Sequence, residues 1–457
     1  MRQAERGDLT QGAIGRGMLL FALPFLGSSL IQQLYNTVDL IFVGRLLGTD
    51  AAAAVGAGSL LITLVLGFFT GMSVGVSVSV SHAYGAGNQK ELHDLIHCAA
   101  GLALAASALL ILFGIFLTPA VLRLMNTPED IMELAVVYIR IYFLSMLPMV
   151  FYNIGSGILR AFGNSRSPMN YQLIGGIANV AGNAFFLCVL RMGVEGVALA
   201  SLVSQLMAAV FTVGHLMKPD SECRLRIRDI TFKKQVCGRI LKIGIPAAIQ
   251  SMVITLSNLI VQAQINSLGI VSIAAFTAYF KVENFVYLPI MAFGQANTTF
   301  CGQNYGAGKW ERMRKGTGVS ILMGVLVTVT ISTLLLTHGY GVFSLFSQNA
   351  EVIELGIRIA QVTFPFYFIY VFLEGFSGAL RGTGKTVGPM AVILVNMCGI
   401  RMLSLWFLMR HYHSAEGVAG IYPITWITTA VCLGVMYWRQ RKNWKLVKIT
   451  KKWAESL

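Results

Sequence analysis

Charged residues are scarce in this sequence. They make up 12% of its 457 residues, whereas 55% are hydrophobic and the mean hydropathy is +0.68. A soluble globular chain has about 25% charged residues, and the few charges here would not cover the surface of soluble domains. The composition therefore excludes a soluble protein and indicates one that crosses a lipid bilayer many times.

Cysteine is also scarce, and its pattern excludes two kinds of site. The seven cysteines are scattered through mostly apolar stretches, in an odd number and without a CxxC pair. We therefore expect neither a disulfide framework nor a thiolate metal site. The N-terminal segment runs from Arg16 into an apolar stretch too long for a signal peptide, without a small-residue cleavage site, so we expect the first span to be retained.

Long apolar stretches are abundant. About 20 residues are needed to cross about 30 Å of hydrocarbon, and the sequence contains twelve stretches of that length, which predict an all-α membrane protein with twelve transmembrane helices. The predicted spans cover residues 17–43, 51–81, 94–118, 132–157, 168–190, 193–217, 239–265, 272–301, 316–338, 353–379, 387–409 and 416–438.

The net charge of +15 is explained by orientation in the membrane rather than by nucleic acid, because the cations lie in short clusters between apolar runs. The two termini and the even-numbered loops hold 27 of the 35 Lys and Arg residues, and the odd-numbered loops hold four. We therefore expect both termini to be cytoplasmic. Residues 218–238 are a basic linker between an N-lobe, 1–217, and a C-lobe, 239–438; the basic tail 439–457 is either solvated or in contact with anionic membrane lipid.

The two halves of the chain contain a duplication. One constant shift along the sequence, the one that places Tyr84 on Tyr305, aligns three pairs of short strings at equivalent span ends. The pairs are Tyr84-Gly85-Ala86-Gly87 with Tyr305-Gly306-Ala307-Gly308, Leu159-Arg160 with Leu380-Arg381, and Glu195-Gly196-Val197-Ala198 with Glu416-Gly417-Val418-Ala419. Six spans per half make the repeats parallel, so we expect two parallel pseudo-symmetric six-helix bundles, an arrangement typical of transporters.

Three further strings carry a family resemblance that covers nearly the whole chain. They are Gln33-Leu34-Tyr35-Asn36-Thr37-Val38-Asp39, Gly302-Gln303-Asn304-Tyr305-Gly306-Ala307-Gly308 and Ser377-Gly378-Ala379-Leu380-Arg381-Gly382. With these strings the sequence resembles the multidrug and toxic compound extrusion (MATE) family of secondary transporters. The resemblance implies export of amphipathic, mostly cationic organic compounds in exchange for H⁺ or Na⁺, by a protein of the cell (inner) membrane. We expect a bacterial, monomeric transporter that is not an enzyme and needs no cofactor beyond the coupling ion.

Asp39 is the first candidate for the coupling residue. A charge inside a span costs at least about 2.5 kcal/mol, so a buried acid needs a reason to be there. Asp39 either pairs with Arg45 near the end of the span or exchanges the coupling ion, and the family resemblance implies the second role. Pro24, fifteen residues earlier, removes a backbone hydrogen bond and predicts a kink, which is either static or a source of two helix shapes.

Asn179 and Asn183 lie one turn apart and share a face of the fifth span. They resemble the polar pair that the family places beside the first-span acid, although many relatives have an aspartate where this chain has Asn183. The missing carboxylate favours protons over Na⁺, because charge count sets affinity for hard cations. Tyr35 and Ser201 also match positions around this pocket, although each alone is typical of packing or an interhelical hydrogen bond.

The predicted C-lobe has its own ionisable residues. Glu374 lies inside the tenth span and is expected to line a cavity, and Lys281 with Glu283 in the eighth span form either an internal pair or part of that cavity. Lys281 and Arg401 also keep open an alternative function, that of a lipid-linked precursor flippase with a cationic cavity.

Two segments resemble sites of soluble enzymes. His93 and His97, one turn apart, can bind zinc, but no third ligand is evident, so we expect interfacial histidines and no metal site; a membrane-embedded metalloenzyme is the remaining alternative. Residues 378–386 resemble a phosphate-binding loop, but five residues separate the first glycine from Gly384-Lys385-Thr386, and the segment joins two membrane helices. We therefore do not expect ATP as the energy source.

Overall fold

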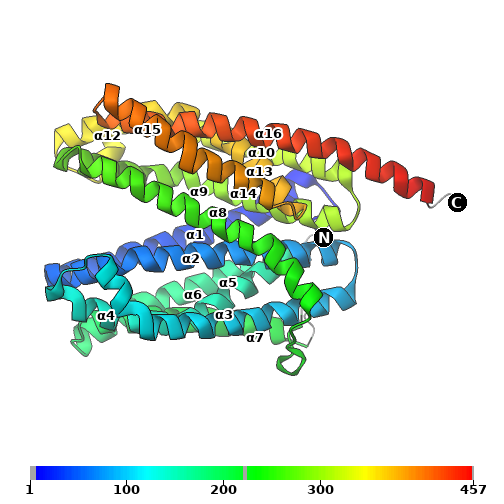
Figure 1. The fold of residues 1–457 in the computed structure, drawn as a ribbon, viewed down its shortest axis with the longest axis horizontal. Coiled ribbons are helices and arrows are strands. Elements are labelled where there is room, and N and C mark those ends of the chain that lie inside the picture. Colours follow the sequence, from blue (N-terminus) through cyan, green and yellow to red (C-terminus); the bar gives the residue numbers. More distant parts are fainter. Residues whose placement is uncertain (1–6, 220–223, 455–457) are drawn as a thin grey trace. The chain divides into compact units, whose positions relative to one another are not determined.

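The described part of the chain is helical. The computed structural model describes residues 7–219 and 224–454, and within these ranges the side chains of residues 40, 60 and 443–454 are left aside. No strand occurs in these ranges, and long helices run side by side in bundles (Figure 1). The predicted all-α fold class is confirmed. Helices are the expected solution for an apolar chain, because a backbone in lipid must satisfy its own hydrogen bonds.

The helices coincide with the twelve predicted spans. Among the described residues, nine helices are long and apolar enough to cross a membrane, or ten when the bent pair Glu129–Leu144 and Met146–Ala161 is included. The first of them, Ile14–Gly85, contains two predicted spans that follow each other without a loop. The remaining predicted span, the eighth, coincides with α9, Ile270–Gly306.

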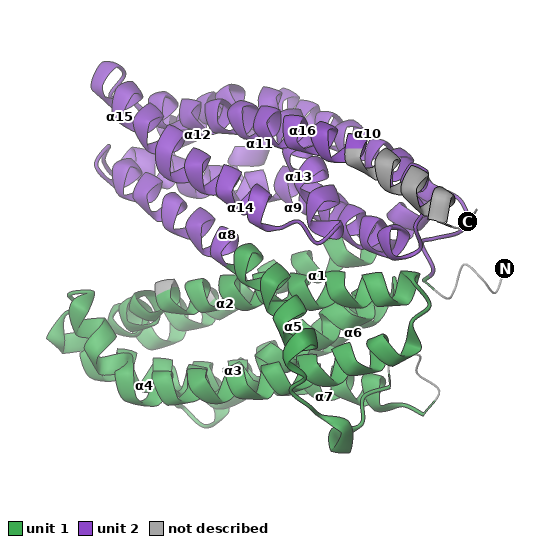
Figure 2. Ribbon diagram, turned by 45° about the vertical axis from the view of Figure 1, so that its right-hand side comes forward, with its two compact units in different colours: residues 1–7, 23–248 green, residues 8–22, 249–457 purple. Residues whose placement is uncertain are grey.

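The chain divides into two compact units, coloured separately in Figure 2. The first unit includes Leu23–Ala248 and the second includes Asp8–Ala22 and Ile249–Leu457, so α1 and α8 are each shared between the units. Each unit has its own hydrophobic core. The predicted linker, 218–238, falls within the first unit, although its residues 220–223 lie outside the described part of the chain, as do 455–457 of the predicted tail.

The first unit is built from the following elements. They are the greater part of α1 (Ile14–Phe42), η2 (Val43–Leu47), α2 (Gly48–Gly85), α3 (Gln89–Leu124), α4 (Glu129–Leu144), α5 (Met146–Ala161), α6 (Arg166–Asn183), η3 (Ala184–Val189), α7 (Val194–Met217), η4 (Ile227–Asp229) and the first part of α8 (Lys234–Asn266).

The second unit contains the start of α1, the rest of α8 and the elements that follow. These are α9 (Ile270–Gly306), α10 (Trp310–Thr337), α11 (Gly339–Phe343), α12 (Ala350–Thr363), η5 (Phe364–Phe366), α13 (Tyr367–Gly382), α14 (Val387–Leu394), η6 (Val395–Ile400), α15 (Arg401–His411) and α16 (Ala415–Ala454).

The duplication is visible in matching helix ends. Gly87 after α2 and Gly308 after α9 have φ angles of 68° and 67°, and each donates its N–H to the carbonyl of the tyrosine three residues earlier. Gly163 and Gly384 form a second matching pair, with φ angles of 80° and 79°. A left-handed residue after a helix satisfies otherwise unpaired carbonyl groups, and glycine takes this conformation without a steric penalty.

The fourth span of each half departs from regular α-helix at an equivalent place. In the first unit α4 and α5 meet at Ser145 with a bend of 43°. In the second unit the short segment η5, Phe364–Phe366, separates α12 from α13. The shift that places Tyr84 on Tyr305 also places Ser145 on Phe366, so both halves depart from regular α-helix at equivalent positions. Among the described residues only the pair in the first half is bent by more than 40°.

The expectation of no disulfide is wrong for one pair of cysteines. Cys98 in α3 and Cys237 in α8 form a disulfide across 139 residues of sequence, within the first unit. The spacing of cysteines along a chain says nothing about pairs that packing brings together, and this pair is produced by the approach of the start of α8 to α3.

Candidate cation-coupling site

Asp39 lies near the end of α1, where the helix changes its winding. Four residues later the chain enters the π-helical segment η2, Val43–Leu47. Asn183 is the last residue of α6, and it is followed at once by the π-helical segment η3, Ala184–Val189. Short π-helical segments occur frequently at functional sites, because they turn side chains and backbone groups out of the regular helix register.

The carboxylate of Asp39 contacts both predicted asparagines. Nδ2 of Asn183 donates to Asp39 Oδ1 at 2.5 Å, and Nδ2 of Asn179 donates to Asp39 Oδ2 at 3.5 Å. Asn183 also donates to Asn179 Oδ1 at 3.3 Å, and the side chains of both asparagines are fully buried. The structure therefore brings Asp39, Asn179 and Asn183 together in one hydrogen-bonded group.

The group contains oxygen atoms that can accept a further hydrogen bond or bind a cation. Asn183 Oδ1 is buried and has no hydrogen-bond partner among the described residues. A protonated Asp39 has an O–H to donate, and a hard cation such as Na⁺ takes carboxylate and amide oxygens as ligands. The arrangement can therefore hold a proton or a small cation, and a buried acceptor left unpaired costs about 1–3 kcal/mol until it is satisfied.

Tyr35 lies one turn before Asp39 and is held by a residue that the sequence analysis missed. Nε2 of Gln172 donates to the Tyr35 hydroxyl at 3.3 Å, and both side chains are buried. Gln172 shares its face of α6 with Asn179 and Asn183, because it precedes them by seven and eleven positions. A helical projection of α6 would have revealed it. Ser201 is buried in α7 and makes no hydrogen bond to Asp39 among the described residues.

Asp39 does not pair with Arg45, the alternative partner that the sequence allowed. Among the described side chains, no ion pair joins Asp39 to Arg45, and Asp39 is bound by the two amides instead. Pro24 lies inside α1, which continues from Ile14 to Phe42 as one helix. The division between the two compact units falls between Ala22 and Leu23, directly before this proline.

Glu374 in the second unit forms a buried ion pair. Its Oε2 lies 2.7 Å from Arg381 Nη2, and the two side chains are 6% and 11% exposed. The approach of α9 covers this pair, since a Cβ atom on Gly294 would lie 2.9 Å from Glu374 Oε2. The carboxylate predicted to line a cavity is thus matched by a cation two turns later on α13.

Glu283 has a different partner from the one considered in the sequence. It accepts a hydrogen bond from the Tyr367 hydroxyl, whereas Lys281 is exposed and forms no ion pair with Glu283 among the described residues. The predicted internal pair is therefore wrong, because positions two residues apart lie on different faces of a helix. Aromatic rings surround this region, with the Tyr367 and Trp426 centroids 4.5 Å apart and those of Tyr370 and Trp426 5.6 Å apart.

Arg401 is buried and donates hydrogen bonds within its own unit. Its Nη1 donates to Ser257 Oγ at 3.2 Å and to Asn258 Oδ1 at 2.8 Å, and its guanidinium lies 5.1 Å from the centre of the Tyr422 ring. The side chain therefore has both polar and cation–π partners. The acids well inside the predicted spans have different partners in the two units. In the first unit Asp39 is bound by amides, and in the second Glu374 has a cation and Glu283 a tyrosine as partner.

Comparison with known proteins identifies the family. One family model, MatE, matches the chain twice, over residues 24–185 and 246–407. The chain belongs to the MATE family. The second match follows the first by almost the same shift that places Tyr84 on Tyr305, so each half of the chain fits the same family model and the duplication is confirmed. Membership makes this protein a multi-pass membrane transporter and not an enzyme.

Individual relatives extend over nearly the whole MATE chain. The probable multidrug resistance protein YoeA of Bacillus subtilis is 26% identical over 448 residues, which are 96% of each chain. The probable multidrug resistance protein YpnP of the same organism is 27% identical over 453 residues, covering 97% of this chain and 98% of the relative. A crystal structure of MATE in the bent conformation matches 96% of this chain and 98% of its own, with a TM-score of 0.90 at 20% identity, which shows the shared fold.

Proposed function

We propose that this MATE transporter exports amphipathic, mostly cationic organic compounds in exchange for H⁺ or Na⁺, with Asp39 as the residue that binds the coupling ion. Two relatives that match nearly the whole chain are named as probable multidrug resistance proteins, which supports the substrate class. The surroundings of the carboxylate are formed by four polar side chains, those of Asn179, Asn183, Tyr35 and Gln172.

The observation that carries this proposal is the group formed by Asp39, Asn179 and Asn183. Asp39 is the only acid well inside the predicted spans of the first half, and it is bound by amides rather than by a permanent cation. A permanent counter-charge would neutralise the carboxylate in every state. A carboxylate without one can be neutralised by the coupling ion, and it is then free to lose that ion when its surroundings change.

Protons are the favoured coupling ion. The amides supply oxygen ligands but no second negative charge, because position 183 is an asparagine. Na⁺ must give up its hydration shell on binding, and affinity for hard cations rises with the number of carboxylates. One carboxylate is enough for a proton, since protonation needs a single basic oxygen.

Cationic substrates are favoured by the chemistry of the spans. Among the described side chains neither Asp39 nor Glu283 forms an ion pair, although Arg401 acts on Glu283 from a longer distance, and aromatic rings lie close to Glu283. Organic cations bind aromatic faces through cation–π contacts worth about 0.5–2 kcal/mol each, and carboxylates through charge. Arg401 already has partners within its own unit, which argues against a role as a free anion-binding group.

We further propose that the protein lies in a bacterial cell membrane as a monomer, with both termini in the cytoplasm. The imbalance of cations between the even-numbered and odd-numbered loops supports this orientation. The linker and the basic C-terminal tail then lie on the cytoplasmic side, where anionic lipid is available to the tail.

Transport by purified protein in liposomes tests the proposal. Vesicles loaded with an ethidium-like dye are given a pH gradient alone, a Na⁺ gradient alone, or no gradient. We expect dye movement against its own gradient when the pH gradient is imposed, and none in protein-free vesicles. If several such dyes move no faster than in protein-free vesicles under either gradient, the proposed antiport of cations is wrong. Movement of an anionic lipid-linked precursor would then support the flippase.

A further inference from the structure

A stretch of the linker and the start of α8 lies along the first turns of α3. Arg239 forms an ion pair with Glu91, and Lys233 Nζ lies 2.7 Å from Asp94 Oδ1. The Cys98–Cys237 disulfide joins the same two segments. All of these residues belong to the first unit, and together they attach the linker to α3.

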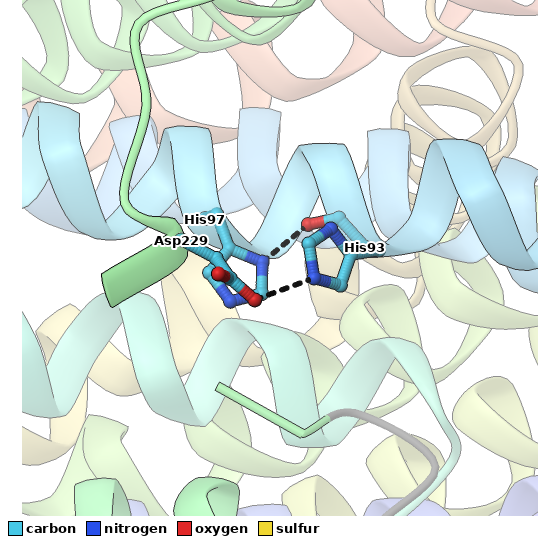
Figure 3. A group of neighbouring side chains, drawn as sticks. All are labelled: His93, His97 and Asp229. Atoms are coloured by element: carbon cyan, nitrogen blue, oxygen red, sulfur yellow. Dashed lines mark hydrogen bonds and ion pairs between the residues drawn. The ribbon is translucent and has the colours of Figure 1, made fainter. Parts of the chain in front are cut away.

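Between these contacts the fold places a carboxylate beside the two histidines of α3. His93 and His97 lie one turn apart with ring centroids 4.0 Å from each other, and Asp229 from η4 lies against them (Figure 3). His93 Nε2 is 3.2 Å from Asp229 Oδ2, and one nitrogen or oxygen from each of the three residues lies within 4.8 Å of the others. The third ligand that the sequence did not reveal is therefore present, and it comes from the distant linker.

The hydrogen bonds of His97 determine which of its nitrogens faces the carboxylate group. Nδ1 lies 2.7 Å from the backbone carbonyl of His93, so it carries the proton and donates. Nε2 then holds a lone pair, and it accepts the backbone N–H of Arg226 at 2.9 Å. Histidines that bind metals commonly donate their other ring nitrogen to a carbonyl or carboxylate in this way, which fixes the orientation of the ring.

The ligand set indicates the class of metal. Two imidazoles and one carboxylate suit zinc and similar transition metals, whereas Mg²⁺ and Ca²⁺ take oxygen ligands. The side chains of His93 and Asp229 are 45% and 36% exposed, while His97 is buried. The site therefore has an open side through which an ion can enter and at which water can complete a tetrahedral shell.

We propose that His93, His97 and Asp229 form a zinc-type metal site that joins α3 to the linker between the two lobes. The metal takes the lone pair of His97 Nε2 and releases the backbone N–H of Arg226. Binding thus exchanges two contacts of the linker, Arg226 N–H with His97 and Asp229 with His93 Nε2, for a metal bond of the same linker through Asp229. Neutral His93 then carries its proton on Nδ1 and offers the lone pair of Nε2 to the metal. The neighbouring cations Arg226 and Arg228 oppose a bound cation, whereas Lys233 is already neutralised by Asp94. The affinity is therefore expected to be lower than that of structural zinc sites.

Zinc titration of the full-length protein tests this site. The protein is purified with a tag that contains no histidine, and Zn²⁺ binding is measured by calorimetry. We expect one Zn²⁺ per chain, and a loss of affinity of about tenfold or more in both His93→Ala and Asp229→Asn. His411→Ala, which removes an exposed histidine at the end of α15, is the matched control and should leave the affinity unchanged.

A second measurement separates a ligand role from a structural role of His97. In His97→Gln the amide oxygen can still accept the Arg226 N–H, so the contact with the linker is kept while zinc binding is lost. Hydrogen exchange at the Arg226 amide should become faster when Zn²⁺ is added to the unmutated protein and should not respond in His93→Ala. Dye transport without zinc should be equal in all variants, which shows that they are folded.

Two results would overturn the proposal. One is the absence of stoichiometric Zn²⁺ binding by the unmutated protein. The other is binding that persists unchanged in both His93→Ala and Asp229→Asn, which would mean an adventitious ion only. Neither result affects the role of Asp39, because the metal site and Asp39 are tested by different ligands and different variants.

Discussion

Replacing Asp39 with asparagine gives the sharpest test of ion coupling. The substitution keeps the size of the side chain and removes its charge. Its amide oxygen can still accept from Asn183, but its NH₂ group replaces the oxygen that accepts from Asn179 at 3.5 Å. Hydrogen bonds to charged groups contribute about 1.5–3 kcal/mol and neutral ones about 0.5–1.5 kcal/mol. About 1–2 kcal/mol is therefore lost, and the removed cost of burying a charge offsets it.

The variant should fold and bind substrate but not couple. Because stability changes by about 1 kcal/mol or less, the melting temperature should shift by no more than about 4 °C. One carboxylate in the site corresponds to one proton per transport cycle. A pH difference of about two units then supplies about 2.7 kcal/mol, which supports a dye ratio of about 100 across the membrane. In Asp39→Asn this ratio should fall to about 1.

The assay compares proteoliposomes under separate pH and Na⁺ gradients with substrate binding on the same preparation. Asp50→Asn is the matched control, since Asp50 is an exposed acid at the start of α2 in the same unit. It should transport like the unmutated protein. If Asp39→Asn still concentrates dye nearly as well as the unmutated protein, Asp39 does not bind the coupling ion. The reasoning about its amide partners would then be refuted, and Glu283, which accepts from Tyr367 and forms no ion pair among the described side chains, would become the candidate.

Three further predictions follow from particular contacts. Glu374→Gln leaves Arg381 buried without its counter-charge and should lower the free energy of unfolding by about 3–5 kcal/mol. Glu416→Gln, in the more exposed pair with Arg358, should change it by about 1 kcal/mol or less. Thermal denaturation measures both variants, and equal effects would contradict the role of burial. A protease site inserted after Asn126 tests the disulfide in purified, air-oxidised protein, because thiols on the proposed cytoplasmic side are kept reduced in the cell. The two fragments should stay joined on a gel without reductant and separate with it, while Cys98→Ser should separate in either case. Separation of the unmutated cysteine pair without reductant would argue against the disulfide. In a cysteine-free background, single cysteines at Lys233 and Lys448 should be labelled only from the cytoplasm, and one at Glu129 only from outside. Labelling of position 233 from outside would contradict the predicted topology.

Local features of this protein were readable from the sequence, because their causes are local. The length of each apolar run sets whether a helix can cross the bilayer, and the shared glycines at positions 87 and 308 predict equivalent helix ends. The four-residue spacing of Asn179 and Asn183 places them on one face through helix geometry alone. The distribution of cations predicts an orientation, which remains a prediction.

The choice of partners was decided only by tertiary packing. Asp39 binds two amides on the distant helix α6 rather than the nearby Arg45. Glu283 accepts from Tyr367 rather than pairing with Lys281, and Asp229 reaches His93 across 136 residues. Spacing along a helix reports which side chains share a face, but not which other helix packs against that face. That second choice depends on how all the apolar surfaces of a unit fit together, and so it appears only in the folded chain.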